Sequence, residues 1–162
     1  MSRMILFDEA RCTNCHLCEM YCSLVFGQRG VYEYRPSIAR IRVVENDDDT
    51  RYVAHVCLQC EAPACVDACP TGALYKDPAT GIVVVDAGEC TGCEMCVDAC
   101  EFDCIFIVGG PSTGSGQRHA VKCEVCDDPL CVRACAVKAL TVGEPDAAYR
   151  ARTEQLYREV RL

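Results

Sequence analysis

The sequence predicts an α+β fold that consists of two small modules with short β-hairpins and a C-terminal helix. Three observations lead to this prediction. Seventeen of the 162 residues are cysteines, and all but one fall into four groups that recur along the chain. Short apolar segments bounded by turn-forming residues separate these groups, as in β-hairpins. Residues 145–162 place apolar side chains near the spacing of a helix.

The four cysteine groups share one pattern, a Cys-x-x-Cys pair followed by two further cysteines. The first and third groups have the spacing C-x2-C-x2-C-x3-C, whereas the second and fourth insert two more residues before the third cysteine. The groups are Cys12, Cys15, Cys18 and Cys22; Cys57, Cys60, Cys65 and Cys69; Cys90, Cys93, Cys96 and Cys100; and Cys123, Cys126, Cys131 and Cys135. Four thiolates are the ligands of a cubane iron–sulfur cluster, and the shorter spacing is the bacterial one. The sequence therefore predicts four [4Fe–4S] clusters.

Two other metal sites are alternatives to this interpretation. Residues 12–16 match the Cys-x-x-Cys-His signature of attached haem. The other groups have Glu61, Glu94 and Asp127 where His16 stands, so haem is disfavoured and His16 is expected to be a residue of the cluster loop. Structural zinc sites use two Cys-x-x-Cys pairs separated by a longer loop, whereas here the third and fourth cysteines follow at once.

The remaining cysteine, Cys104, stands outside the four groups. It follows the third group at the position that Ala73 and Ala139 occupy after the second and fourth groups. Free cysteine behaves as a small hydrophobic residue and is often buried. We therefore expect a buried free thiol at Cys104.

Short β-segments are expected before and between the groups. Residues 5–7 form one before the first group. Three hairpins are predicted, pairing 38–44 with 52–56, 73–75 with 82–85, and 105–108 with 119–121. The acidic residues 45–49 form the turn of the first hairpin, and the Gly-rich stretch 109–117 predicts a flexible loop in the third.

The C-terminal segment is predicted to be a helix, with Pro145 in its first turn. Its apolar stripe consists of Tyr149, Leu156 and Val160, and its arginines are Arg150, Arg152, Arg158 and Arg161. A helix of this size needs a surface to pack on. The arginines favour a docking element for an acidic partner surface, and packing on the protein's own body is the alternative.

Composition excludes several classes of function. A net charge of −8 disfavours nucleic acid as a partner. No apolar run reaches the roughly 18 residues of a membrane span, and residues 1–12 lack the pattern of an export signal, so we expect that the protein is not exported. Clustered cysteines then favour metal ligation in the reducing cytoplasm over disulfides. No nucleotide-binding fingerprint or catalytic constellation is present, so the chain is expected to be non-catalytic and its clusters to transfer electrons.

Residues 4–142 resemble a known family, the four-cluster ferredoxin-like electron-transfer subunits of molybdenum and tungsten pterin oxidoreductases of the dimethyl sulfoxide reductase and formate dehydrogenase type. The motifs are CLQCEAPACVDACPTGAL at 57–74, TGIVVVDAGECTGCEMCVDAC at 80–100 and KCEVC at 122–126. The chain is most similar to the small subunit of tungsten aldehyde oxidoreductase of aromatic-degrading bacteria. It departs from the family pattern in that only the second group is followed by proline, Pro70.

The resemblance implies tandem, nested modules of the bacterial two-cluster ferredoxin type. The outer module comprises 1–50 and 110–142, the inner module comprises 51–109, and 143–162 form the C-terminal helical tail. The 20 residues between the second and third groups hold one hairpin, which supports pairing of those groups. The implied ligand sets are set 1 (Cys12, Cys15, Cys18 and Cys135), set 2 (Cys57, Cys60, Cys65 and Cys100), set 3 (Cys90, Cys93, Cys96 and Cys69) and set 4 (Cys123, Cys126, Cys131 and Cys22).

The resemblance also implies partners. The protein would conduct electrons between a large catalytic subunit that contains a pterin, such as an aldehyde oxidoreductase, and a redox partner such as a flavin NAD-linked subunit. Self-association into an electron wire is a further expectation. The alternatives are a free-standing soluble polyferredoxin and a ferredoxin partner of carbon monoxide dehydrogenase or hydrogenase. Four arginines beside the first group (Arg29, Arg35, Arg40 and Arg42) and those of the tail favour the subunit.

Overall fold

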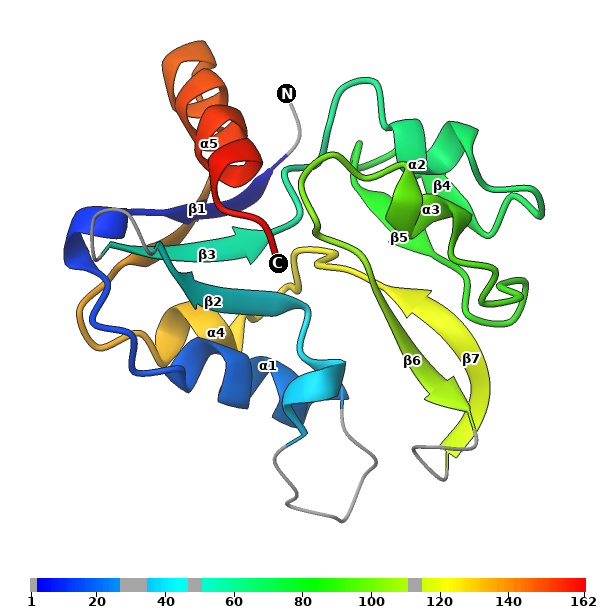
Figure 1. Ribbon diagram of the computed structural model, residues 1–162, viewed down its shortest axis with the longest axis horizontal. Helices are drawn as coiled ribbons and strands as arrows, with labels where there is room; N and C mark the ends of the chain where they lie inside the picture. The colour runs from blue at the N-terminus through cyan, green and yellow to red at the C-terminus, as the bar shows by residue number, and fades with distance from the viewer. Residues whose placement is uncertain (1–2, 27–34, 47–50, 111–114) are drawn as a thin grey trace.

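The computed structural model describes residues 3–26, 35–46, 51–110 and 115–162 (Figure 1). Within these ranges the strands form antiparallel two-stranded sheets. The pairs are β1 (Met4–Phe7) with β8 (Leu140–Gly143), β2 (Ile41–Glu45) with β3 (Tyr52–Val56), β4 (Leu74–Lys76) with β5 (Val83–Val85), and β6 (Phe106–Gly110) with β7 (Ser115–Val121). This mixture of short helices and hairpins confirms the predicted α+β composition.

A helix begins within each cysteine group. The α-helices are α1 (Leu17–Phe26), α2 (Ala64–Asp67), α3 (Met95–Asp98), α4 (Leu130–Arg133) and α5 (Ala147–Glu159), and two 3-10 turns are η1 (Glu9–Arg11) and η2 (Pro36–Ile38). Each of α1 to α4 contains the third cysteine of one group. Three of them are only four residues long, which is too short to be stable without tertiary contacts.

The three predicted hairpins are confirmed. The first pairs Ile41 with Val56, and the second pairs Leu74 with Val85. In the third, β7 begins at Ser115, four residues before the predicted strand. Because β6 and β7 both extend into the Gly-rich stretch, backbone pairing continues where composition predicts a loop. Residues 111–114 of that loop and 47–50 of the acidic turn lie outside the described residues.

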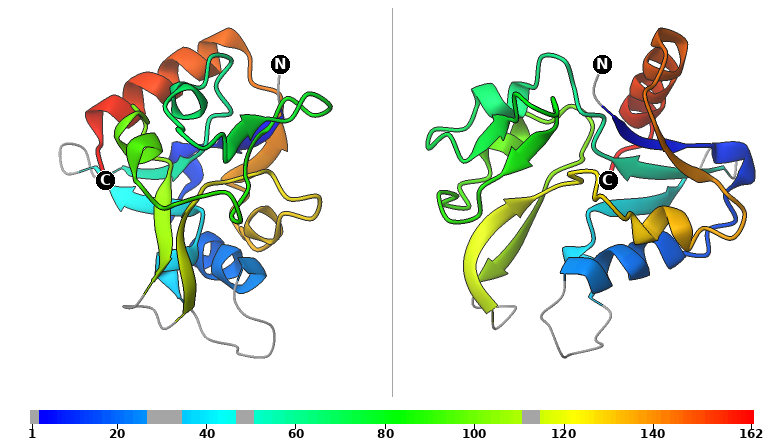
Figure 2. Two further views of the ribbon diagram at one scale, coloured as in Figure 1. Left: turned by 90° about the vertical axis from the view of Figure 1, so that its right-hand side faces the viewer. Right: turned by 180° about the vertical axis from the view of Figure 1, so that it is seen from behind.

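The two ends of the chain meet in one sheet. β1 and β8 pair from Met4 opposite Gly143 to Phe7 opposite Leu140. Figures 1 and 2 show α1 beside α4 on this side of the molecule, while α2, α3, β4 and β5 lie together on the other. The predicted module boundary at 50/51 falls between β2 and β3, and the one at 109/110 falls within β6. Hairpins rather than linkers therefore connect the two sides.

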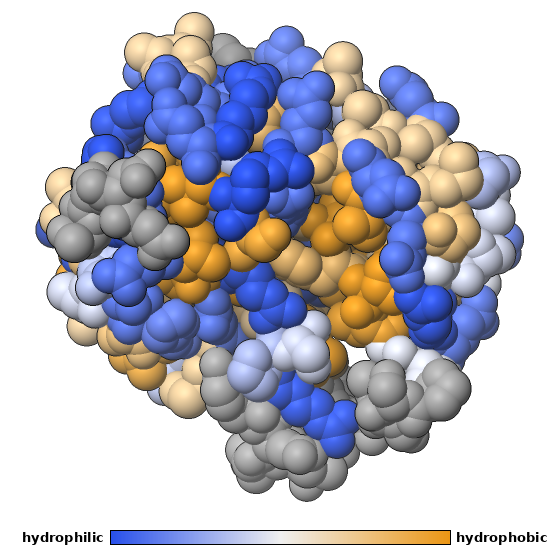
Figure 3. Space-filling view, viewed as in Figure 1, coloured by the Kyte–Doolittle hydropathy of each residue, from blue (hydrophilic) through white to orange (hydrophobic). Residues whose placement is uncertain are grey.

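The buried apolar residues are distributed over both sides. Ile5, Ile41 and Leu140 belong to a core under the sheets that contain the chain ends, and Leu74 and Ile105 belong to a second one on the other side. On the face shown in Figure 3, apolar side chains reach the surface in two areas, near β3 and near β6, and hydrophilic side chains cover much of the rest. Each core also contains cysteine side chains, so the apolar packing surrounds the cysteine groups.

Helix α5 packs on the body of the protein. Asp146 caps its start by accepting a hydrogen bond of 2.7 Å from the Tyr149 backbone N–H, so Pro145 lies before the helix and not in its first turn as predicted. Tyr157 is 1 % exposed; its hydroxyl donates to the Ala54 carbonyl and accepts from the Val56 N–H at 3.2 Å. Three of the tail arginines contact the same body, for example Arg161, whose Nε lies 2.8 Å from Asp103. The structure thus favours the alternative interpretation of the tail over the docking element.

We expect Tyr157→Ala to lower the free energy of unfolding by about 3–5 kcal/mol, because it leaves a cavity and removes the partner of two buried backbone groups. Anaerobic thermal denaturation of the cluster-containing protein would measure the loss. Tyr75 is 47 % exposed and serves as the control. Tyr75→Ala should change stability by less than about 0.5 kcal/mol. Equal effects of the two substitutions would contradict the anchoring role of Tyr157.

Candidate metal centres

The four cysteine loops share one backbone conformation. The residue just before the second cysteine has positive φ in each loop, namely 54° at Asn14, 49° at Gln59, 67° at Gly92 and 53° at Val125. A β-branched residue is strained in this region, so Val125 holds a conformation that its own side chain disfavours. Such strain persists where the surrounding structure requires it, often at functional sites. The loops therefore adopt the same turn despite different sequences.

Two cavities are each lined by one complete set of four thiols. The first contains all of set 1, so that Cys135 from the end of the chain meets three cysteines from its beginning. The second contains all of set 3, with Cys69 beside the three cysteines of the following group. In both cavities the fourth cysteine comes from a different group than the other three.

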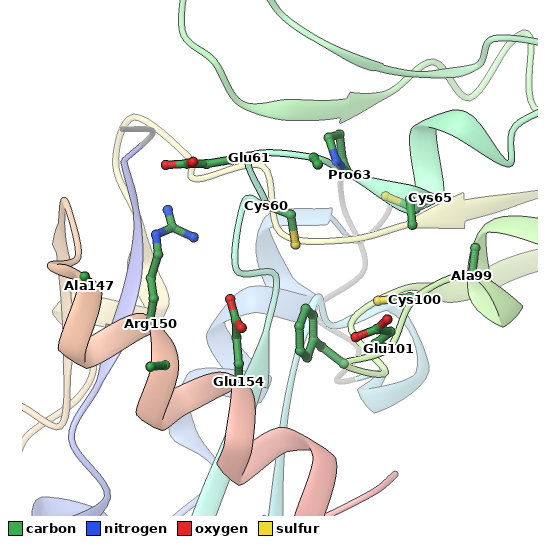
Figure 4. Close-up of a pocket in the computed structure, with 14 residues that line it drawn as sticks. Cys60, Glu61, Pro63, Cys65, Ala99, Cys100, Glu101, Ala147, Arg150 and Glu154 are labelled. Atoms are coloured by element: carbon green, nitrogen blue, oxygen red, sulfur yellow. The ribbon is translucent and has the colours of Figure 1, made fainter.

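A third cavity brings together most of set 2. Cys60, Cys65 and Cys100 line it, and Figure 4 shows these residues on one side and Arg150 and Glu154 of α5 on the other. The remaining member, Cys57, is close enough to raise the pKa of both Cys60 and Cys65. The set 2 thiols therefore surround a cavity that α5 partly covers.

Set 4 is gathered around Cys131. Burial raises the pKa of the Cys131 thiol, and the nearby Cys22, Cys123 and Cys126 thiolates raise it further. Cys22, which comes from α1, also accepts a hydrogen bond of 3.2 Å from the Arg40 N–H. The structure thus brings Cys22 next to the fourth group rather than leaving it with its own neighbours in sequence.

Burial and mutual repulsion disfavour free thiolates in these sets. Burial raises the pKa of Cys65 to about 12 and that of Cys96 to about 11, and neighbouring thiolates of the same set contribute to both increases. Metal ligands must be deprotonated, so a bound group has to supply positive charge. Iron ions do so. Cys100 is an exception, because hydrogen bonding from Cys104 lowers its pKa to about 6.

Cys104 is buried and free of a disulfide, as predicted. Its backbone N–H lies 3.5 Å from the Cys100 sulfur, and its own thiol donates to the Phe102 carbonyl at 3.1 Å. The corresponding backbone N–H of Ala139 donates to Cys135 at 3.2 Å. Hydrogen bonds to the ligand sulfurs are one of the factors that set the potential of an iron–sulfur cluster. The small-residue position after the third and fourth groups is therefore part of the site.

The donor sets fit cubane clusters. Among the described residues, no three His, Cys, Asp or Glu side chains converge closely enough to hold a single ion. A cubane holds four irons and needs a wider cage of four thiolates. Its ligation by four cysteines leaves no iron free for a substrate. Fold and donor sets together define the class, a small iron–sulfur protein with several clusters.

Comparison with known families identifies this class more closely. Residues 49–112 match the 4Fe-4S dicluster domain, and residues 9–31 match a 4Fe-4S binding domain. The protein therefore binds [4Fe–4S] clusters, and its 17 cysteines are sufficient for four of them. No helix in the described ranges has the length and apolar character needed to cross a membrane.

Two relatives from Escherichia coli K12 show the family, and a third is similar over a smaller share of its own length. The sequence is 31 % identical to the B subunit of anaerobic dimethyl sulfoxide reductase, with 86 % of this protein and 72 % of the relative covered. It is 31 % identical to the putative electron transport protein YsaA, with 96 % and 98 % covered. It is 35 % identical to the ferredoxin-like protein YdhX over 88 % of this protein, and it spans only 65 % of YdhX. The protein belongs to the family of 4Fe-4S ferredoxin-like electron-transfer proteins.

Sequence reasoning missed three polar residues near the thiols. Lys122 and Gln59 are fully buried, although such side chains are mostly exposed in proteins. Glu19 is 7 % exposed; it contacts His16 at 3.0 Å, which places this histidine in the first cysteine loop. Nothing in their spacing distinguishes these residues from surface residues. Only their positions next to cysteines could have drawn attention to them.

Proposed function

We propose that this protein is the non-catalytic electron-transfer subunit of a cytoplasmic oxidoreductase complex, whose catalytic subunit carries a tungsten or molybdenum pterin and acts on an aldehyde. The observation that carries the proposal is the gathering of four thiol sets in a protein related to a named subunit of dimethyl sulfoxide reductase. The choice of tungsten and of an aldehyde follows the sequence resemblance. The many reduced thiols required for ligation favour the cytoplasm.

We further propose that sets 1 to 4 are the ligands of four separate clusters, with sets 1 and 4 in the outer module and sets 2 and 3 in the inner one. The β1–β8 pairing supports the outer module, because it joins the strand before the first group to the strand after the fourth. The cavities lined by sets 1, 2 and 3 support the exchange of the fourth cysteine between groups.

The protein residues hold, orient and shield the clusters, each of which supplies reversible one-electron transfer. Sets 2 and 4 adjoin, since the Cys57 thiolate raises the pKa of Cys123 and both side chains pack in one apolar cluster. Two members of the sets, Cys15 and Cys93, are exposed. They belong to sets 1 and 3. The geometry therefore supports a path that enters at one of these sets and leaves at the other, through sets 2 and 4.

We expect the native protein to contain about sixteen irons and sixteen sulfides per molecule, four of each per cluster. Anaerobic metal and sulfide analysis measures this content, and affinity purification from its native host tests for a large pterin-containing polypeptide. The substitution Tyr75→Ala, which changes no cysteine, should retain the iron. Zinc in place of iron would contradict the cluster assignment. Full iron content without a stable partner would contradict the subunit assignment.

A free-standing polyferredoxin is the second candidate. It is favoured by the match to YsaA over nearly the whole length of both proteins, since that relative's name describes an electron transport protein and no complex. The two candidates predict different behaviour during purification. A free carrier should elute alone at the size of a single polypeptide and should reduce or oxidise several unrelated enzymes.

A further inference from the structure

A buried lysine lies where the two sides of the molecule meet. Lys122 immediately precedes the fourth cysteine group, and it has 0 % exposed surface. Its ammonium group donates to the carbonyl of Val83 in β5 and, at 2.9 Å, to the carbonyl of Cys123. Lysine is rarely buried, because its charge must be separated from water. The complete burial of Lys122 therefore calls for an explanation.

The surrounding contacts form a bridge along the free edge of β5. The Gln59 amide donates to the Cys123 carbonyl at 2.8 Å and accepts from the Val83 N–H at 2.9 Å. Glu124 accepts from the Val85 N–H at 3.1 Å. These side chains replace the missing neighbour strand and fix the fourth cysteine loop against β5. The position of the Lys122 ammonium is thereby fixed relative to both sides.

Two cysteine loops that belong to different sets meet at this ammonium. The Cys123 carbonyl of the set 4 loop accepts hydrogen bonds from both the Lys122 ammonium and the Gln59 amide, and Gln59 belongs to the set 2 loop. Another lysine, Lys76, donates at 3.0 Å to the Cys60 carbonyl and is only half-buried. Lys76 thus contacts the set 2 loop, whereas Lys122 lies between sets 2 and 4.

We propose that Lys122 is a fixed positive charge that raises the reduction potentials of the two clusters meeting at this junction, those of sets 2 and 4. This inference rests on the ligand sets proposed above. Reduction adds one negative charge to a cluster, and a nearby cation stabilises the reduced form more than the oxidised one. The effect is large inside the protein, where charges are poorly screened. Lys122 is a potential-setting residue; it neither ligates iron nor carries the electron.

The test is an anaerobic redox titration of the complete protein, followed by paramagnetic resonance, with each signal first assigned through a Cys→Ser substitution in its set. We expect Lys122→Gln to lower the potentials of sets 2 and 4 by about 59 mV or more, which corresponds to a tenfold change in the ratio of reduced to oxidised cluster. The reduction potentials of sets 1 and 3 should change much less. Lys122→Arg keeps the charge and should retain the original potentials.

Lys76→Gln is the matched control. It removes one lysine charge from the set 2 loop alone. It should therefore shift the reduction potential of set 2 weakly and leave that of set 4 unchanged. Lys122→Met provides a second neutral variant if Lys122→Gln loses iron. Unchanged potentials in a neutral variant with full iron content, or equal shifts in all four sets, would overturn the proposal and leave the function intact. Loss of iron from both neutral variants would show that Lys122 is needed to hold the clusters in place, and it would overturn the proposal. Absence of clusters from the unaltered protein would overturn function and inference together.

Discussion

Removing the iron with a chelator under anaerobic conditions is expected to unfold most of the protein. Helices α2, α3 and α4 have four residues each, and isolated two-stranded hairpins are at best marginally stable in water. The apolar cores contain cysteine side chains, so the clusters are part of what these cores pack around. Ligand sets of this kind are not preformed in an unfolded polypeptide, and metal binding then contributes directly to folding.

Far-ultraviolet circular dichroism, recorded together with iron content during chelation, measures this effect. The ellipticity should fall in parallel with the iron, and the iron-free protein should show no cooperative thermal transition. Incubation of an identical sample with the chelator already saturated by iron is the control. An iron-free protein that kept its ellipticity and melted cooperatively would show that apolar burial alone maintains the fold.

The second large effect is expected from Cys22→Ser. This residue follows three cysteines of set 1 in sequence, but it lies beside Cys131 of set 4. We therefore expect loss or conversion of the set 4 cluster, seen as a change in one of four paramagnetic signals, with set 1 preserved. Spectra of the reduced variant, with iron analysis, decide between the sets.

Cys104→Ala is the control for Cys22→Ser. It also removes one buried thiol, but the residue lies outside the four sets and alanine occupies the same position after Cys69 and Cys135. All four clusters should persist in it. If Cys22→Ser removed the set 1 signal instead, the cysteines of the first group would ligate one cluster together and the nested arrangement would be wrong.

Local features of this fold could be predicted from the sequence. The hairpins were recognisable because alternating apolar residues and turn-forming residues are local signals, and the same holds for helix α5. The pairing of β1 with β8 could not be derived from local pattern, since its partners are separated by most of the sequence and only the repeated groups suggested their association. The start of β7 at Ser115 could not be predicted, because the glycine-rich composition of 109–117 indicates a loop. In the structure, Ser115 pairs with Gly110 of β6.

The apolar stripe predicted for the C-terminal helix shows that a local pattern can identify a helix without identifying the residue that holds it to the body of the protein. Tyr149, Leu156 and Val160 were recognised as apolar, but the most deeply buried residue of the helix is Tyr157. Its hydroxyl bonds to the backbone of β3, a contact that periodicity does not reveal. The cysteine positions needed no such context, because metal ligation demands particular residue types at fixed spacing. No comparable spacing pattern in the sequence marks Lys122 as a buried residue.

The pairing of β1 with β8 also bears on how the protein is made. A ribosome adds roughly 5–20 residues per second, so β1 waits on the order of ten seconds before its partner emerges. During that interval Met4 and Ile5, each 1 % exposed in the finished protein, lack their partner strand. The β4–β5 hairpin, by contrast, spans only the twelve residues from Leu74 to Val85. The β4–β5 hairpin can therefore form before β1 and β8 pair, and the sheet that joins the first and fourth cysteine groups is completed last.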